Sequence, residues 1–374
     1  MTDRHTHRTD GDHVEKALFA MLRTGMWPER APETEPLTDD EWQTLYGTAR
    51  KQTLCGILFD GYKRWPEELQ PPAELKVKWA MRIHRMEERS RQLNRLSALV
   101  TDNFARDGFR SCILKGQGVA LSYPNPLHRS AGDIDIWVEG GRERVLPYLR
   151  STGKVGEVVY HHIDFPVRKD VEIEVHTTPT WMNNPLRNHR LQRMFRAWGD
   201  GCFSHRTLLP DGHVIYTPTA EADQLYLLLH LYRHLFDEGV GLRHLTDYAL
   251  VMDRTYTPQN AATLRRHLQR LGMLPFAGAV FHVLTRYLGY PAGKVPVCPD
   301  MRRGEAFMRE VMAGGNFGHY DERNRHAADE TKGGRFVRKV KRNLRFLFSY
   351  PDETLSSPLF KSGHYLWRKA NGFV

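Results

Sequence analysis

Two aspartates separated by one residue, Asp133 and Asp135, give the clearest chemical signal, in the run GDIDIWV at 132–138. Polar and apolar residues alternate there, which predicts a β-strand with both carboxylates on one face. Adjacent carboxylates repel each other unless a cation or a proton lies between them. Because Mg²⁺ prefers oxygen ligands, the pair indicates a divalent metal site. The alternative is an edge strand with two solvated aspartates, although Asp is depleted in strands.

A second alternating run, VEIEVH at 171–176, places Glu172, Glu174 and His176 on one face of another predicted strand. If this strand lies beside the first, Glu174 or Glu172 adds a third carboxylate to the aspartate pair. Three carboxylates can hold two metal ions roughly 3.5–4 Å apart, which is the arrangement used for in-line phosphoryl transfer.

A glycine-containing turn precedes both acidic strands. The short apolar run 111–114 ends in Lys115, Gly116, Gln117 and Gly118, and a helix is predicted to follow. Glycines let backbone N–H groups approach a phosphate, and a helix N-terminus favours anions. Lys115 would add a positive charge. Glycine is also common at such turns for steric reasons, so the order of turn, aspartate strand and glutamate strand is the more specific signal.

The further candidates for substrate contact are four histidines, His162, His176, His230 and His234. His161 and His162 lie on a predicted strand beside the acidic residues, so one of them should face the carboxylates; the alternative is a surface or core histidine. His230 and His234 are four residues apart and share a helix face. This spacing can bind zinc, but the glutamate of the HExxH motif is absent, which favours packing or a substrate contact. His176, on the glutamate strand, belongs to the same group of candidates.

Two charged features lie in the C-terminal half. Arg243 and Asp247 are four residues apart, which predicts an ordinary pair on a helix. The segment 335–348 is basic and amphipathic, with six Lys or Arg residues among apolar ones up to Arg345. Three interpretations of it stay open: a solvated helix face, a nucleic-acid contact and a membrane-surface helix.

The sequence pattern of the first hundred residues predicts an all-helical region. Residues 1–13 are polar and are expected to form a mobile leader, while apolar residues recur at helical spacing over 14–27. A connector with three prolines follows at 28–36. Thr38 and Glu41 have the spacing of an N-terminal capping box, which predicts a helix to about Thr53. A long helix is predicted over 73–107.

The pattern changes after residue 100. Strands are predicted at 111–114 and 133–138, a helix at 142–149, and a β-hairpin from strands at 158–167 and 171–176. Helices are then predicted near 185–197, 219–236, 242–253, 260–271, 276–288 and 302–312, with a loop at 319–334. The expected organisation is a helical N-terminal region (1–100), an α/β core (101–180) and a helical C-terminal domain with a basic tail (181–374).

At this point the chain resembles the uncharacterised bacterial nucleotidyltransferase-like family, which belongs to the DNA-polymerase-β-like nucleotidyltransferase superfamily. The residues that carry the resemblance are ILKG at 113–116, Tyr123, Pro124, Arg129, GDID at 132–135 and EVH at 174–176. The helical stretch 227–247 and GNFG at 315–318 are also similar. The resemblance covers residues 100–350, approximately, and the first hundred residues carry little of it.

The resemblance implies an α+β fold, with a small mixed-sheet nucleotidyltransferase core flanked by helical N-terminal and C-terminal regions. It implies Asp133 and Asp135 as the metal pair and Glu174 as the third carboxylate, with Mg²⁺ or Mn²⁺ as cofactor. The substrate would be an NTP, with ATP expected. Arg129 would neutralise phosphate charge or form a structural ion pair. The implied nucleotide-binding residues are Lys115, Gly116, Gln117 and Arg129.

Composition narrows the class of protein. The chain has 374 residues, enough for two or three domains, and 40% of them are hydrophobic, as in globular proteins. Its net charge of +10 suits an anionic partner such as a nucleotide or nucleic acid. There is no run of about 20 apolar residues and no apolar signal segment, so no membrane span is expected. The four cysteines are far apart without a CxxC motif, so a cytoplasmic protein without disulfides is expected.

The expected function is therefore metal-dependent transfer of an NMP from an NTP to an acceptor hydroxyl on a small molecule, an RNA or a protein. One alternative is a non-catalytic nucleotide- or RNA-binding regulatory module on the same fold. Another is an RNA-binding protein that acts through the basic C-terminal helix. The complete set of three carboxylates argues against a decayed active site.

Overall fold

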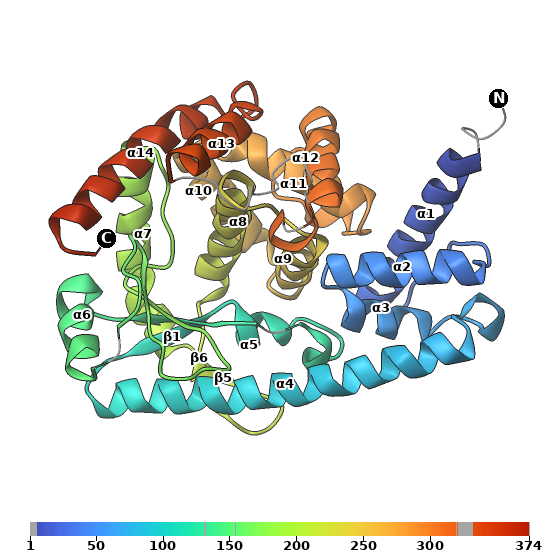
Figure 1. Cartoon of the computed structure of the whole chain (residues 1–374), viewed down its shortest axis with the longest axis horizontal. Coiled ribbons are helices and arrows are strands. Elements are labelled where there is room, and N and C mark those ends of the chain that lie inside the picture. Colours follow the sequence, from blue (N-terminus) through green and yellow to red (C-terminus); the bar gives the residue numbers. More distant parts are fainter. Residues whose placement is uncertain (1–5, 131, 154, 319, 321–331, 374) are drawn as a thin grey trace.

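The computed structural model describes residues 6–130, 132–153, 155–318, 320 and 332–373. These residues form a mostly helical α+β structure around a small four-stranded sheet (Figure 1). This architecture confirms the expected fold class. Within the described part of the chain, no helix combines the length and the apolar character that crossing a bilayer requires.

The N-terminal region is helical, as the sequence predicts. Its elements are α1 (Thr6–Met26), α2 (Asp39–Lys51), α3 (Cys55–Tyr62), the short η1 (Glu67–Leu69) and α4 (Ala73–Arg106). The capping box before α2 is present, with the Thr38 N–H donating to the Glu41 carboxylate at 2.8 Å. The expected leader is wrong for residues 6–13, because α1 begins at Thr6; residues 1–5 lie outside the described residues. Helix α3 was not expected, since it is buried nearly all round and has no amphipathic period.

Helix α4 is 34 residues long and runs along one whole side of the molecule (Figure 1). Its first half packs on the N-terminal helices through Trp79 and Ile83. Its second half packs on the sheet through Leu93 and Phe104. One helix thus joins the N-terminal region to the core.

The sheet has the order β1-β2-β4-β3, with β2 and β4 parallel and both outer pairs antiparallel. The strands are β1 (Ser111–Leu114), β2 (Ile134–Val138), β3 (His162–Asp164) and β4 (Ile173–His176). Apolar side chains of the strands, including Ile136 and Val175, share a core with α4 and with α6 (Gly141–Ser151). Helix α6 contributes Val145 to this core. The predicted hairpin is present, but its strands are shorter than expected and residues 165–172 connect them.

The C-terminal region is a set of helices, close to the spans that the sequence predicts. The helices are α7 (Pro185–Ser204), α8 (Ala220–Asp237), α9 (Leu242–Arg254), α10 (Pro258–Leu271), α11 (Leu274–Arg286), α12 (Met301–Gly314), α13 (Lys332–Leu344) and α14 (Pro351–Ala370), with short turns η3 (Ala292–Lys294) and η4 (Asn316–Gly318). Helix α14 was not expected, because Pro351 was interpreted as a stop; it is instead the first residue of a helix, where the missing N–H costs nothing. Of the predicted loop at 319–334, residues 319 and 321–331 lie outside the described residues.

A second, two-stranded sheet was also not expected. Its strands are β5 (Arg206–Leu208) and β6 (Val214–Tyr216), which pair antiparallel. They are three residues each, too short for a clear alternation of apolar and polar side chains.

The N-terminal and C-terminal helices share one hydrophobic core. The Trp27 indole donates to the Leu288 carbonyl at 2.7 Å, and the Leu242 N–H donates to the Gln52 side chain at 2.8 Å. The α/β sheet has its own smaller core against α4 and α6. The site described next lies where the sheet meets helices α8 and α9.

Candidate active site

The turn after β1 carries Lys115 in a strained backbone conformation. Its φ of 52° is in the left-handed region, which is rare for a residue with a side chain, and Gly116 follows with φ of 41°. These two residues reverse the chain into the short helix α5 (Gly116–Ala120). The turn directs the Lys115 side chain toward β2, where its Nζ lies 2.9 Å from Asp135 Oδ2.

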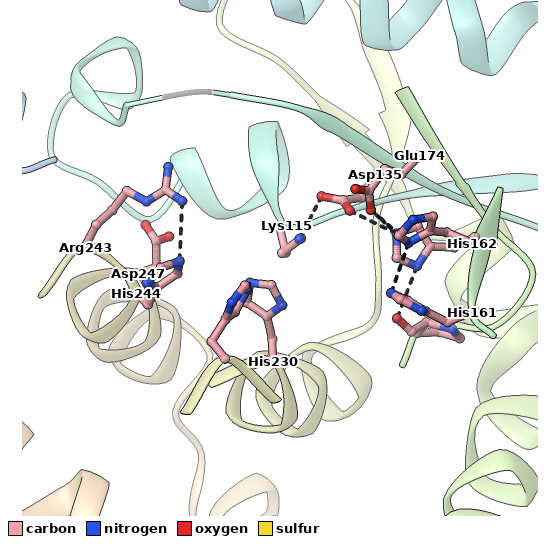
Figure 2. A network of polar contacts seen from close by, with 12 residues as sticks. Lys115, Asp135, His161, His162, Glu174, His230, Arg243, His244 and Asp247 are labelled. Atoms are coloured by element: carbon pink, nitrogen blue, oxygen red, sulfur yellow. Dashed lines mark hydrogen bonds and ion pairs between the residues drawn. The ribbon is translucent and has the colours of Figure 1, made fainter. Parts of the chain in front are cut away.

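Asp135 and Glu174 are direct neighbours across the parallel strands β2 and β4. Asp135 is only 2% exposed, and both of its oxygens are engaged, Oδ2 by Lys115 and Oδ1 by His176 Nε2 at 2.9 Å (Figure 2). The conditional prediction that the glutamate strand lies beside the aspartate strand is therefore correct. The pairing of β2 with β4 brings one aspartate, Asp135, and one glutamate, Glu174, together.

The opposite charges of the side chains around Asp135 stabilise one another. Burial opposes the ionised form of Asp135, but the Lys115 ammonium and the His176 ring outweigh it and hold the Asp135 pKa far below its usual range. Burial likewise lowers the pKa of His176, yet its bonds to Asp135 and Glu174 raise that pKa to about 9. His176 is thus an imidazolium at neutral pH, which hydrogen-bonds to the Pro179 carbonyl through Nδ1 at 3.2 Å.

His162 is the histidine that faces the carboxylates. Its Nδ1 lies 3.1 Å from Glu174 Oε2, and its Nε2 lies 3.3 Å from Asp164 Oδ1. His161 instead packs against Trp181, with ring centroids 4.2 Å apart. Asp164 was not among the predicted site residues; the alternation of His162 and Asp164 along β3 was the signal that could have found it.

Asp133 occupies a different position from the one expected. Strand β2 begins at Ile134, so Asp133 lies just before it, half-buried. One compact set of possible ligands, the one that includes Asp135, is Asp135, Glu174 and His176, whose ligand atoms lie within 4.8 Å of one another. Asp133 is not in this set. It lines the neighbouring pocket together with Lys115, close enough to raise the Lys115 pKa.

That pocket lies between the turn and helices α8 and α9, and its lining has more cationic than acidic side chains (Figure 2). It is lined by Lys115, Gly116, Arg129, Gly132, Asp133, Leu227, His230, Leu231, Arg243, His244 and Asp247. Three cations and two histidines face two carboxylates. Such a lining attracts an anion with several charges.

Arg129 forms a buried ion pair with Asp247. Its Nε and one terminal nitrogen each donate to the Asp247 carboxylate at 2.9 Å, and the Tyr123 hydroxyl donates to the same carboxylate at 2.6 Å. Arg129 and Asp247 are 6% and 7% exposed. The structural role considered for Arg129 is therefore real, although the residue also lines the pocket. Asp247 is held mainly by these core residues, rather than only by Arg243 four positions earlier on α9.

Gln117 does not face the pocket with its side chain. It is 3% exposed, and its Oε1 accepts a hydrogen bond from the Ser97 hydroxyl at 3.2 Å, which ties α5 to α4. The Gln117 side chain is therefore engaged with α4, and a phosphate contact by it stays a prediction. A role for its backbone N–H stays a prediction.

His230 and His234 meet a third histidine that the sequence did not indicate. Their Nε2 atoms lie 3.0 Å apart, and His244 from α9 completes the group. Burial, with nearby cations, holds the pKa of both His230 and His244 well below the usual range, so both are neutral. His244 was missed because α9 reaches α8 only in the folded chain.

The basic segment forms α13 and the turn after it. Lys339 and Lys341 are exposed, but Arg342 is 9% exposed and donates to the Leu235 carbonyl of α8 at 3.0 Å. Arg345 lies 3.8 Å from Glu310. Part of the predicted basic face is therefore used to attach α13 to the rest of the protein.

Comparison with known families shows the family of the chain. The sequence model of the uncharacterised nucleotidyltransferases matches residues 38–289, from just before α2 to just after α11. The chain belongs to this nucleotidyltransferase family. The resemblance seen in the sequence is thereby confirmed, although the match also takes in α2–α4 and ends before GNFG at 315–318.

Comparisons with solved structures and with curated proteins add less to the assignment of the family. An antigenic nucleotidyltransferase-like protein from Paracoccidioides brasiliensis is similar to this protein with 12% identity and a TM-score of 0.31, over 57% of this chain and 96% of that one. No curated protein matches.

The donors in this member of the nucleotidyltransferase family suit a hard divalent ion. Asp135 and Glu174 offer carboxylate oxygens side by side, which Mg²⁺ and Mn²⁺ prefer, and Asp133 is two residues away along the chain. The Lys115 ammonium already lies against Asp135, so the chain places a cation of its own there. The residues fit a metal ion, provided that Lys115 shares or yields its place beside Asp135.

Proposed function

We propose that this protein is a metal-dependent nucleotidyltransferase that moves an NMP from an NTP, with ATP expected, to an acceptor hydroxyl. The observation that carries the proposal is the placement of the Asp135–Glu174 pair beside a pocket lined by Lys115, Arg129 and Arg243. Carboxylates for a metal ion and cations for a polyphosphate are the two requirements of nucleotidyl transfer, and here they meet at one turn. The family membership supports the same reaction class.

The basic pocket would hold the triphosphate. Lys115 borders both the pocket and Asp135, so its ammonium can pass from the carboxylate to a phosphate oxygen when the substrate binds. Arg129 is held rigidly by Asp247, and Arg243 donates to the Ser130 carbonyl at 3.2 Å. Preorganised cations of this kind stabilise developing charge without reorganisation during the reaction.

Glu174 would receive the proton of the acceptor hydroxyl. It is 22% exposed at its side chain, so it remains accessible, whereas Asp135 is buried. His162 and His176 contact the same Glu174 oxygen, at 3.1 and 3.4 Å, and orient it. Asp133, Asp135 and Glu174 are the residues that would hold Mg²⁺ or Mn²⁺. When bound, such an ion would polarise the phosphate and lower the pKa of the acceptor hydroxyl.

The proposal is tested by incubating the full chain with each of the four NTPs, radiolabelled at the α-phosphate, and Mg²⁺ or Mn²⁺. The acceptors are total tRNA, a metabolite extract and the protein itself. We expect transfer by the wild type and its loss in Asp133→Asn/Asp135→Asn. Asp211→Asn, at an exposed hairpin position, is the matched control and should transfer normally. Equal labelling by wild type and double variant would contradict the proposal.

One observation favours a second candidate, a non-catalytic nucleotide-binding module. Both Asp135 oxygens are already satisfied by Lys115 and His176, so the site is neutralised without a metal. The melting temperature separates the candidates. A module that binds nucleotide through the cations alone would be stabilised by NTP without Mg²⁺, whereas the proposed enzyme requires both.

A further inference from the structure

A cavity of about 280 Å³ lies on another side of the β1–α5 turn. It is enclosed by α5, the β5–β6 hairpin, the start of α8 and the end of α9. Its lining is Lys115, Gly118, Val119, His205, Thr207, Thr217, Pro218, Ala220, Asp223, Arg254 and Thr255. Apart from Lys115, it shares no residue with the basic pocket, so it is a separate space. The reaction proposed above assigns it no role.

Asp223 is the decisive residue of this cavity. Its side chain is 7% exposed, and its buried Oδ1 has no hydrogen-bond partner among the described residues. A buried carboxylate oxygen without a donor is costly, and such groups usually have a partner. Burial, assisted by Asp247, raises the pKa of Asp223 to about 7, although Arg254 and Arg129 act in the opposite direction. A donor is therefore missing at this position.

The lining also includes threonine hydroxyl groups that already take part in hydrogen bonds within the protein. The Thr255 hydroxyl donates to the Val251 carbonyl at 2.6 Å and accepts from the Gln224 amide at 2.7 Å. The Thr207 and Thr217 hydroxyl oxygens bond to each other at 2.7 Å. Hydroxyl oxygens with a used donor still have a lone pair to offer. The cavity thus calls for a ligand that brings hydrogen-bond donors.

Size restricts the ligand further. Pockets for drug-sized ligands have volumes of about 300–1,000 Å³, so a cavity of about 280 Å³ suits a smaller molecule. Arg254 is exposed on the lining and the Lys115 ammonium is paired with Asp135, so Asp223 is the buried carboxylate of the lining that lacks a donor.

We propose that this cavity binds a small molecule with a primary ammonium group and hydroxyl groups, the ammonium donating to Asp223. The threonine oxygens accept from the hydroxyl groups. A charge-assisted bond to a carboxylate in a buried site is about twice as strong as a neutral one, which gives the ammonium its preference. The inference goes beyond nucleotidyl transfer and does not depend on it, because it concerns binding to the free protein.

The test compares two probes of the same shape, 2-amino-1,3-propanediol and glycerol, which differ by an ammonium in place of a hydroxyl. Binding to the full chain is measured by isothermal titration calorimetry near neutral pH. We expect the amine to bind at least tenfold more tightly than glycerol. Asp223→Asn, which keeps the shape and removes the charge, should abolish this preference, while Asp211→Asn should retain it.

A second variant keeps the test informative if Asp223→Asn folds poorly. Ala220→Leu, at the first position of α8, fills the cavity without changing any charge and should abolish binding of both probes. Equal binding of amine and glycerol by the wild type, or no binding of either, would overturn the proposal. So would an amine preference that persists in Asp223→Asn or amine binding that persists in Ala220→Leu.

Discussion

At the scale of single residues, the two aspartates of the DxD motif have different environments. Asp135 is buried and held by Lys115 and His176, both within 2.9 Å. Asp133 is half-buried at the edge of the basic pocket. One carboxylate therefore belongs to the internal charge network of the sheet, and the other faces the space where a nucleotide would enter.

This difference predicts unequal effects of the two substitutions on the free energy of unfolding. Asp135→Asn leaves the buried charges of Lys115 and His176 without their counter-ion, so we expect it to lower the free energy of unfolding by about 3 kcal/mol. Asp133→Asn should change it by less than about 0.5 kcal/mol. Urea unfolding without metal or nucleotide measures both. Equal effects of the two variants would show that Asp135 is not held as described.

At the scale of elements, the β1–α5 turn combines backbone strain with a candidate site residue. Lys115 has a φ of 52°, a conformation that costs a residue with a side chain of order 1–3 kcal/mol. The residue at this position is a lysine and not a glycine, and the Lys115 ammonium contacts Asp135. Such strain at a candidate site is consistent with a role for the side chain.

The strain predicts an unusual order of stabilities. Lys115→Ala and Lys115→Gly both lose the ion pair, but only glycine relieves the backbone, so we expect Lys115→Gly to be more stable than Lys115→Ala by about 1 kcal/mol. At Lys78, exposed on helix α4, the same two substitutions should give the reverse order, because glycine disfavours a helix interior. Chemical unfolding of the four variants checks both differences. The same order at both positions would contradict the strained turn.

A second element-scale feature is the junction between α3, α4 and the short helix η2 (Pro126–His128). His128 lies between two carboxylates, with Nδ1 2.8 Å from Asp60 of α3 and Nε2 3.0 Å from Glu87 of α4. A Cβ on Gly56 would lie 1.9 Å from the His128 carbonyl oxygen, so only glycine permits this packing. His128 thus fastens the N-terminal helices to the segment that leads into β2.

This junction predicts a pH-dependent stability. Burial opposes the charged form of His128, but Asp60 and Glu87 outweigh it and raise the His128 pKa. The stabilisation is therefore complete below the ordinary histidine pKa of about 6.5 and is lost as the pH rises through the raised value. His128→Asn should cost about 2–3 kcal/mol near pH 6 and less near pH 9. As a control, His84→Asn, at an exposed site on α4, should change the free energy of unfolding by less than about 0.5 kcal/mol near pH 6 in the same measurements.

At the scale of the whole molecule, buried ion pairs join parts that are far apart in the sequence. Arg129 of the core pairs with Asp247 of α9, and Arg233 of α8 lies 3.1 Å from the fully buried Glu353 of α14. The first pair also forms one wall of the basic pocket. The position of the C-terminal helices over the sheet, and hence the shape of the pocket, depends on such contacts.

A double-mutant cycle tests this connection. Arg129→Met or Asp247→Leu alone strands a buried charge, so we expect each to lower the free energy of unfolding by about 3–5 kcal/mol. The double variant removes both charges and should lose at least about 2 kcal/mol less than the sum of the two. The exposed pair Arg168 and Asp170 is the matched control and should show no measurable coupling. Additive losses at Arg129 and Asp247 would contradict the buried pair.

Local sequence patterns were enough to predict much of the secondary structure of this protein and its family. Alternation around Asp135 and Glu174 predicted two strands, and their adjacency followed once the hairpin was assumed to lie beside the first strand. Helical periodicity predicted most of the C-terminal helices, and the family resemblance was visible in the motifs alone. These features are readable because side-chain periodicity and turn residues act over a few neighbouring positions.

The tertiary structure decided which residues share a site. The ion pairs of Lys115 with Asp135 and of Arg129 with Asp247, the approach of His244 to His230, and the cavity around Asp223 all join segments distant in the sequence. No local pattern marks them, because a charged residue has the same sequence signal whether it faces water or a buried partner. Burial and distance, which decide between an exposed charge and an ion pair, arise only when the helices pack on the sheet.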